Sequence, residues 1–222
     1  MDRFDQSVIS ASESALSTNK VLRNTYSLLA MTLIFSGITA TISTLVQVPP
    51  MFSLISMIAA MVIAMFVLPK KANSSTGIAL VFLITGLLGF SLGPILNQYL
   101  AMQGGGQIIT LAFGGTGVIF LGLSAYVLTT KRDFSFLGGF LAVGFMVVLV
   151  AAIANIFFAI PALSLAISSA VIFIMSGFIL YDTSRIINGG ETNYIMATVG
   201  LYINIFNIFV HLLSILGIMS DD

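Results

Sequence analysis

Four long stretches of this chain contain no Asp, Glu, Lys or Arg, and they constrain the fold more than any other feature. They cover residues 24–69, 72–130, 134–181 and 192–220. A helix needs about 20 apolar residues, at a rise of about 1.5 Å each, to cross the roughly 30 Å hydrocarbon core of a bilayer. The first three stretches are each long enough for two such helices, and the last holds one. The sequence therefore predicts seven membrane-spanning helices.

The composition excludes several classes of protein. Of the 222 residues, 58% are hydrophobic and 7% charged, against about 25% charged in an ordinary soluble domain. Eight basic residues balance eight acidic ones, which excludes a strongly basic face for nucleic acid. The chain has no cysteine, so it has no disulfide framework and no thiol nucleophile. No motif for a cofactor or a metal is present, and none is predicted.

Proline and glycine residues divide the long stretches where turns are needed, at residues 48–50, 93–106 and 160–161. Because lipid cannot satisfy backbone polar groups, each segment is expected to be a helix. The predicted fold is an all-α, seven-helix membrane bundle (24–218) between a polar tail (1–23), flexible or weakly helical, and a short acidic tail (219–222). The predicted spans are residues 24–45, 50–69, 76–96, 107–129, 135–158, 161–187 and 192–218.

The basic residues predict the orientation of the bundle. Three lie in the N-terminal tail, two after the second span, two after the fourth and one after the sixth, so all eight fall on one side of the membrane. Cytoplasmic loops carry an excess of Lys and Arg. We therefore expect the N-terminus in the cytoplasm and the C-terminus in the periplasm of an inner-membrane protein.

Small residues recur at four-residue spacing, a pattern typical of helices whose backbones approach closely in lipid. We expect such packing for three pairs and for a glycine-rich segment in the fourth span. These are Ser36 with Ala40, Gly89 with Gly93, Ser164 with Ser168, and the glycines 114, 115, 117 and 122. The G-x-S-x-G pattern at residues 89–93 does not indicate a hydrolase, because a nucleophile elbow requires a strand-to-helix turn. The chain is predicted not to be an enzyme.

The last span carries one polar stripe, since Gly200, Asn204, Asn207, His211 and Ser214 follow 4-3-4-3 spacing. Such side chains are costly against lipid, so this face is predicted to point into the bundle and the helix to be central. The two asparagines either bond to neighbouring helices or line a solvated path. His211, the only histidine, is either a neutral hydrogen-bonded group or a pH switch.

Asp182, near the end of the sixth span, is the only acidic residue flanked by a long apolar run, so it is the strongest candidate for a functional carboxylate. Arg185 lies three residues further on, within reach for an ion pair. Two interpretations stay open, a structural ion pair at the interface and a gate or proton-linked latch.

Several segments together resemble one family. They are residues 86–96 (GLLGFSLGPIL), 124–139 (SAYVLTTKRDFSFLGG), 180–183 (LYDT) and 201–209 (LYINIFNIF), with 16–26 and 189–195. The chain resembles the Bax inhibitor-1-like family over nearly its whole length, and within it the bacterial YccA-like branch. The resemblance implies seven helices with the last one central.

The resemblance also implies two activities. YccA-like proteins are associated with the membrane-bound, ATP-dependent protease FtsH, which they occupy as poor substrates. Other members are associated with a pH-sensitive calcium leak that an aspartate pair on the last two helices gates. The first aspartate corresponds to Asp182, but the second corresponds to Asn204, which cannot exchange a proton as a carboxylate does. A plain hairpin near residues 189–190 does not place these two residues level, so their contact is expected to need a helix break or a longer turn.

The prediction is therefore a multi-pass inner-membrane protein that binds and modulates FtsH. The polar tail, with Lys20 and Arg23 at its end, is predicted to engage the protease. The alternative is a pH-sensitive leak for calcium or other cations, with Asp182, Asn204, Asn207, His211 and Arg185 at the gate or along the pathway. The bilayer, the protease and a calcium ion or proton are the predicted partners, and nucleic acid is not one.

Overall fold

The computed structural model describes the backbone of residues 2–220 and the side chains of Leu16 and residues 18–220. Its helices are α1 (Asp2–Leu45), α2 (Pro50–Val62), the π-helical η1 (Ile63–Val67), α3 (Leu68–Lys71), α4 (Ser75–Ser91), α5 (Gly93–Leu100), α6 (Gly105–Thr130), α7 (Leu137–Phe158), α8 (Pro161–Ile187) and α9 (Tyr194–Ser220). Seven helical segments are long and apolar enough to cross a membrane. The predicted number of spans and the all-α class are confirmed. Asp221 and Asp222, in the predicted acidic tail, lie outside the described residues.

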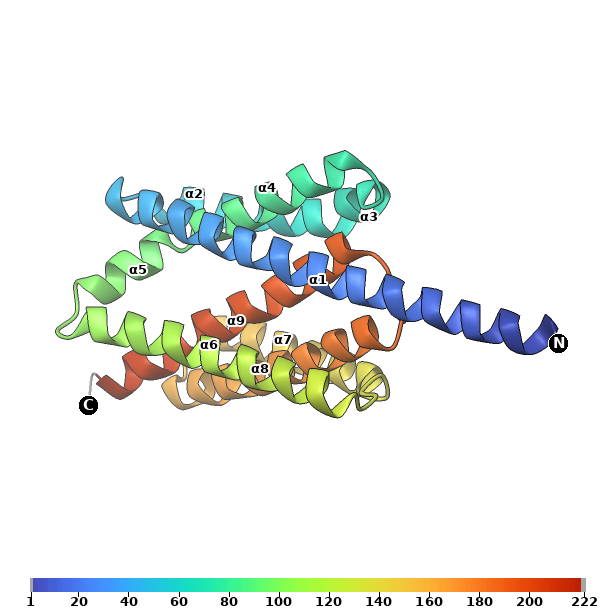
Figure 1. Ribbon diagram of the computed structural model, residues 1–222. Helices are drawn as coiled ribbons and strands as arrows, with labels where there is room; N and C mark the ends of the chain where they lie inside the picture. The colour runs from blue at the N-terminus through green and yellow to red at the C-terminus, as the bar shows by residue number, and fades with distance from the viewer. Residues whose placement is uncertain (1, 221–222) are drawn as a thin grey trace.

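The first helix is longer than the sequence analysis predicts. It begins at Asp2 instead of near residue 24, and its membrane-spanning part begins at Thr18. Residues 2–36 contain no glycine or proline. Extending a helix that the apolar span has already nucleated costs little, so the polar segment continues as helix beyond the bundle. Figure 1 shows this end of α1 projecting on the same side as α3 and the α8–α9 connection.

Two prolines inside spans cause irregular turns. A proline in a helix lacks the amide N–H and its ring clashes with the carbonyl four residues earlier. Before Pro69 the helix widens into η1, where the Leu68 N–H bonds to the Ile63 carbonyl. Before Pro94 the third span breaks between α4 and α5, and the Ser53 hydroxyl on α2 donates to the Ser91 carbonyl at the break. The second and third spans are therefore not straight rods.

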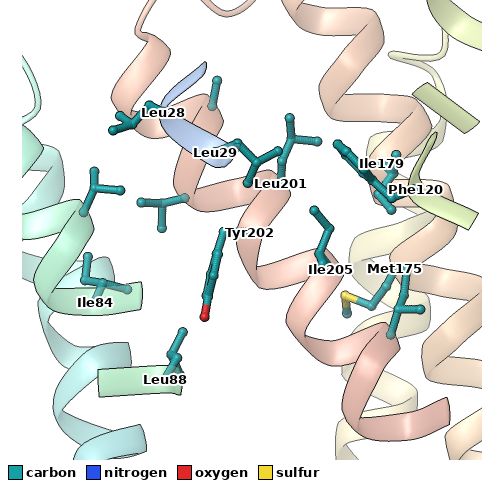
Figure 2. Close-up of a cluster of buried hydrophobic side chains, with 14 of the residues drawn as sticks. Leu28, Leu29, Ile84, Leu88, Phe120, Met175, Ile179, Leu201, Tyr202 and Ile205 are labelled. Atoms are coloured by element: carbon teal, nitrogen blue, oxygen red, sulfur yellow. The ribbon is translucent and has the colours of Figure 1, made fainter. Parts of the chain in front are cut away.

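Helix α9 occupies the centre of the bundle, as its polar stripe predicts. It packs against α1 and α4 on one side and against α6 and α8 on the other, whereas α7 packs on α8. Figure 2 shows side chains of α9 between these two groups of helices. The labelled residues are Leu201, Tyr202 and Ile205 of α9, Leu28 and Leu29 of α1, Ile84 and Leu88 of α4, Phe120 of α6, and Met175 and Ile179 of α8.

The predicted small-residue packing is confirmed between α1 and α4–α5. Gly89 lies directly against the backbone and hydroxyl of Ser36, and Gly93 lies against Ser43. Ala40, between these two contacts on α1, is buried. A side chain at either glycine would separate the two helices.

The same prediction is wrong for most of the glycine-rich segment of α6. Gly114, Gly117 and Gly122 have open space where a Cβ would stand, and only Gly115 of the four comes near another helix, at Leu212. The residues of α6 that are buried follow a different stripe, through Ala112, Thr116, Phe120 and Ser124. Four-residue spacing alone does not say which face of a helix meets its neighbours.

Candidate functional site

The two strongest site candidates meet at the seam between α8 and α9. The amide Nδ2 of Asn204 donates to the Asp182 carboxylate oxygen Oδ2 at 2.8 Å, and Asn204 is 6% exposed. One turn before Asn204, Gly200 leaves room for the carboxylate, since a Cβ there would lie 3.3 Å from Oδ2. The pair therefore joins the last two spans.

Of the two expected routes to this contact, a helix break or a longer turn, the structure has the second, because α8 and α9 are unbroken and residues 188–193 connect them. Asp182 lies five residues before the end of α8 and Asn204 ten residues after the start of α9, a difference of about 7 Å along the helix axes. Side chains on a helix tilt toward its N-terminus. In this antiparallel pair the Asp182 side chain tilts away from the α8–α9 connection and the Asn204 side chain tilts toward it. The two side chains therefore close the offset between unbroken helices.

The predicted ion pair between Asp182 and Arg185 is not formed. The Arg185 guanidinium lies 3.6 Å from Glu191 Oε2, donates to the Gly190 carbonyl at 3.0 Å, and stacks 5.5 Å from the centre of the Tyr181 ring. The arginine points along the α8–α9 connection because its acidic partner lies there, outside the apolar part of the span. Asp182 keeps the amide of Asn204 as its partner.

Two further residues of the polar stripe, His211 and Ser214, also contact α8. Nδ1 of His211 lies 3.1 Å from the hydroxyl of Ser168, which in turn donates to the hydroxyl of Ser214 at 3.4 Å. This contact gives His211 a hydrogen-bond partner on α8. Asn207 differs, because its Nδ2 donates to the Ile203 carbonyl of its own helix. The stripe thus contacts α8 at two levels, at Asn204 and seven residues further along at His211.

The last turns of α8 connect the elements at one end of the bundle. Asp182 bonds to α9, Thr183 lies 3.5 Å from the Tyr26 hydroxyl of α1, Ser184 bonds to the α6–α7 loop, and Arg185 bonds to the α8–α9 connection. Each of these four consecutive side chains points in a different direction around the helix. This end of α8 therefore holds α1, α9 and the two adjacent loops in place, and the spacing of residues in the sequence does not reveal these contacts.

The α6–α7 loop is held through Ser184 and Asp133. The Ser184 hydroxyl accepts from the Phe134 N–H at 2.8 Å and lies 3.3 Å from the Asp133 carboxylate. Asp133 also accepts from the hydroxyl and the N–H of Ser135. These bonds, led by the Ser135 hydroxyl, hold the pKa of Asp133 below its ordinary value of about 3.9. The carboxylate is therefore ionised at neutral pH.

Two hydroxyls and a backbone carbonyl that the sequence does not single out meet in the middle of the bundle. The Tyr202 hydroxyl of α9 donates to the Thr85 carbonyl of α4 at 3.2 Å and lies 2.5 Å from the Ser36 Oγ of α1. Tyr202 is 1% exposed. We call these three residues the hydroxyl node. In the sequence, Tyr202 is an ordinary residue of an apolar helix, and nothing there indicates its partners more than 100 residues away.

The remaining candidates lie apart from this seam. Lys20 and Arg23 are exposed on α1, near the end that projects from the bundle. In the described part of the chain, no three Asp, Glu or His side chains gather where they could hold a metal ion. The seam offers a cation one carboxylate and one amide, whereas Ca²⁺ takes about six to eight oxygen ligands.

These features define a class before any comparison is made: a seven-span membrane protein whose central last helix is joined to its neighbours by buried polar contacts. The chain belongs to the Bax inhibitor-1 family, because residues 18–221 match the family described as "Inhibitor of apoptosis-promoting Bax1". The expected family is confirmed.

Named relatives refine this assignment. The chain is 57% identical over 209 residues, 94% of each protein, to "Modulator of FtsH protease YccA" of Escherichia coli K12. It matches "Inner membrane protein YccA" of Escherichia coli O6:H1 to the same extent. It is 52% identical over 213 residues, 96% of each protein, to "Uncharacterized membrane protein" of Vibrio cholerae. The chain is a multi-pass protein of the inner membrane.

Proposed function

We propose that this protein modulates the membrane-bound, ATP-dependent protease FtsH, which it occupies as a slowly degraded substrate. The observation that carries the proposal is the 57% identity, over 94% of both chains, to a protein named as a modulator of that protease. The match extends over nearly the whole of both proteins.

The shape of α1 supports the same role. Its polar end continues beyond the bundle as a helix, on the side to which the basic residues assign the cytoplasm (Figure 1). A protease that pulls substrates from the cytoplasm needs such a segment to grip. Lys20 and Arg23 are exposed where this segment meets the membrane-spanning part, so both are available to a partner.

Removal of the projecting segment tests the proposal. Deletion of residues 2–18 is expected to abolish capture of the chain by the purified protease in proteoliposomes, while the protein still folds. The double variant Lys20→Ala/Arg23→Ala is expected to weaken capture. Lys70→Ala/Lys71→Ala, which removes two exposed basic residues at the same end of the bundle, serves as the matched control. Unchanged capture of the truncated protein would contradict the proposal.

A second candidate, from a different class, is a pH-sensitive cation leak. The contact between Asp182 and Asn204 favours it, because it brings a carboxylate and an amide together inside the bundle. Calcium flux into liposomes, scanned from about pH 5 to about pH 8, tests this function. Flux above that of empty liposomes that disappears in Asp182→Asn would support a leak. No flux at any pH would count against it.

A further inference from the structure

Helix α1 is attached to the rest of the bundle by polar contacts at three levels. Near the projecting end, the Thr198 hydroxyl of α9 lies 3.3 Å from the Thr25 carbonyl. Near the other end, the Asn97 amide of α5 donates to the Thr44 carbonyl at 3.1 Å. Between them lies the hydroxyl node, where Ser36 contacts Tyr202. The helix that carries the projecting segment is thus held along its whole span.

The hydroxyl node differs from the other two levels in its number of partners. The Tyr202 hydroxyl joins three helices at one point, since it contacts Ser36 of α1 and the Thr85 carbonyl of α4 while Tyr202 itself belongs to α9. All three residues are buried, at 6%, 1% and 0% exposure for Ser36, Tyr202 and Thr85. No water is within reach in the hydrocarbon core, so groups separated there lose their partners without replacement.

The backbone around Ser36 adds a steric constraint. Gly89 of α4 lies against the carbonyl and hydroxyl oxygens of Ser36 and the hydroxyl of Thr39. Ser36 therefore sits in a notch that exists only because residue 89 has no side chain. If α1 slides along its axis, Ser36 leaves this notch and meets the adjoining turns of the third span on the same face, where Thr85 and Leu92 carry side chains. The helices must then separate before α1 can move.

From these contacts we propose that the hydroxyl node, seated in the Gly89 notch, is the anchor that resists extraction of α1 and makes degradation slow. The inference rests on the proposed function, because it concerns the helix that the protease would pull. It assigns the slow rate to Tyr202, Ser36 and Gly89, none of which touches the protease. They are positioning residues in the body of the bundle.

The variant Tyr202→Phe tests the anchor with the smallest change. It removes one oxygen, and with it both contacts of the node, but keeps the ring in the core. A hydrogen bond between helices in a bilayer corresponds on average to roughly a threefold change in an equilibrium. We expect the maximal rate of degradation in proteoliposomes to rise by about threefold to tenfold, with an unchanged KM because capture by the tail is unaffected.

Matched controls separate the node from general effects of losing a hydroxyl. Thr41→Val removes a hydroxyl from the same helix that faces outward and bonds to its own Gly37 carbonyl, and Tyr126→Phe removes an exposed tyrosine hydroxyl from α6. Neither is expected to change the rate. Ser36→Ala removes the α1 partner of the Tyr202 hydroxyl and is expected to accelerate degradation, as Tyr202→Phe does. An unchanged maximal rate in both node variants, with capture intact, would overturn the anchor.

A measurement without the protease distinguishes failure of the anchor from failure of the protease role. The protein is held in a bilayer and pulled mechanically by its N-terminus, and the force that releases α1 is recorded. Tyr202→Phe is expected to lower this force, and Thr41→Val to leave it unchanged. Equal forces for wild type and Tyr202→Phe refute the anchor. If instead the wild-type chain is never captured by the protease while the force difference is present, the anchor stands and the protease role is wrong.

Discussion

The same substitution, glycine to alanine, is expected to have opposite effects at two positions of this bundle. Gly89 on α4 is buried against the backbone of α1, whereas Gly114 on α6 is exposed with open space around its Cα. Both residues lie inside a membrane-spanning helix, and both changes add one methyl group. Any difference between the two variants therefore reports on the tertiary contact and not on the residue type.

The magnitude follows from the neighbours of each position. At Gly89 the added carbon would overlap the Ser36 carbonyl oxygen, a backbone atom that can move only with its helix, and would pull Ser36 away from Tyr202. Overpacking costs about 1–3 kcal/mol, and a backbone neighbour places Gly89→Ala near the upper value. Gly114→Ala has no such neighbour and gains up to about 1 kcal/mol from the higher helix propensity of alanine. The expected gap in free energy of unfolding between the two variants is therefore about 3–4 kcal/mol.

Reversible unfolding in bicelles, for wild type and both variants, measures this gap directly. Gly89→Ala is expected to lower the free energy of unfolding and Gly114→Ala to keep or raise it. Equal free energies for the two variants would refute the reasoning, because they would mean that α1 and α4 do not meet at Ser36 and Gly89. A large loss in Gly114→Ala would show instead that this face of α6 meets another surface.

Three further outcomes are expected. Asn204→Leu removes the amide that donates to Asp182 and should destabilise the fold by about 2 kcal/mol in the same unfolding assay. The Asn207 amide bonds only to its own helix, so Asn207→Leu should cost less than about 1 kcal/mol. In this cysteine-free chain, a thiol at Gln103→Cys should react with a membrane-impermeant maleimide from the periplasmic side, and one at Lys131→Cys only in inverted vesicles. The pKa of Asp133 is lowered in the folded protein, so its stabilising contribution is present above its unfolded pKa of about 3.9 and disappears only as the pH falls below that value. Hydrogen-exchange protection of the α6–α7 loop should therefore be constant from about pH 5 to about pH 8, and Asp133→Asn should lower it throughout that range.

The sequence by itself determined the number of spans, their approximate ends and the inward face of the last helix. In a bilayer an apolar segment has few alternatives to a helix, so composition decides the secondary structure directly. Asn204, His211 and Ser214 could be assigned to the interior for a similar reason, since they are costly against lipid. The first helix begins earlier than predicted, because the polar segment contains no residue that breaks a helix. Hydropathy identifies apolar spans but does not show how far a helix continues into a polar segment.

Tertiary structure decided which polar groups meet. The Asp182–Asn204 contact depends on the opposite tilts of side chains in an antiparallel pair, and Arg185 bonds to Glu191 because the connection turns toward it. The hydroxyl node joins residues 36, 85 and 202, and the notch at Gly89 lets Ser36 approach the third span closely. Hydropathy and residue spacing predict the length and the polar face of each helix. They do not predict its position along its axis or its rotation relative to the neighbouring helices. Those follow from packing between segments far apart in the chain, where one glycine decides how closely two backbones approach.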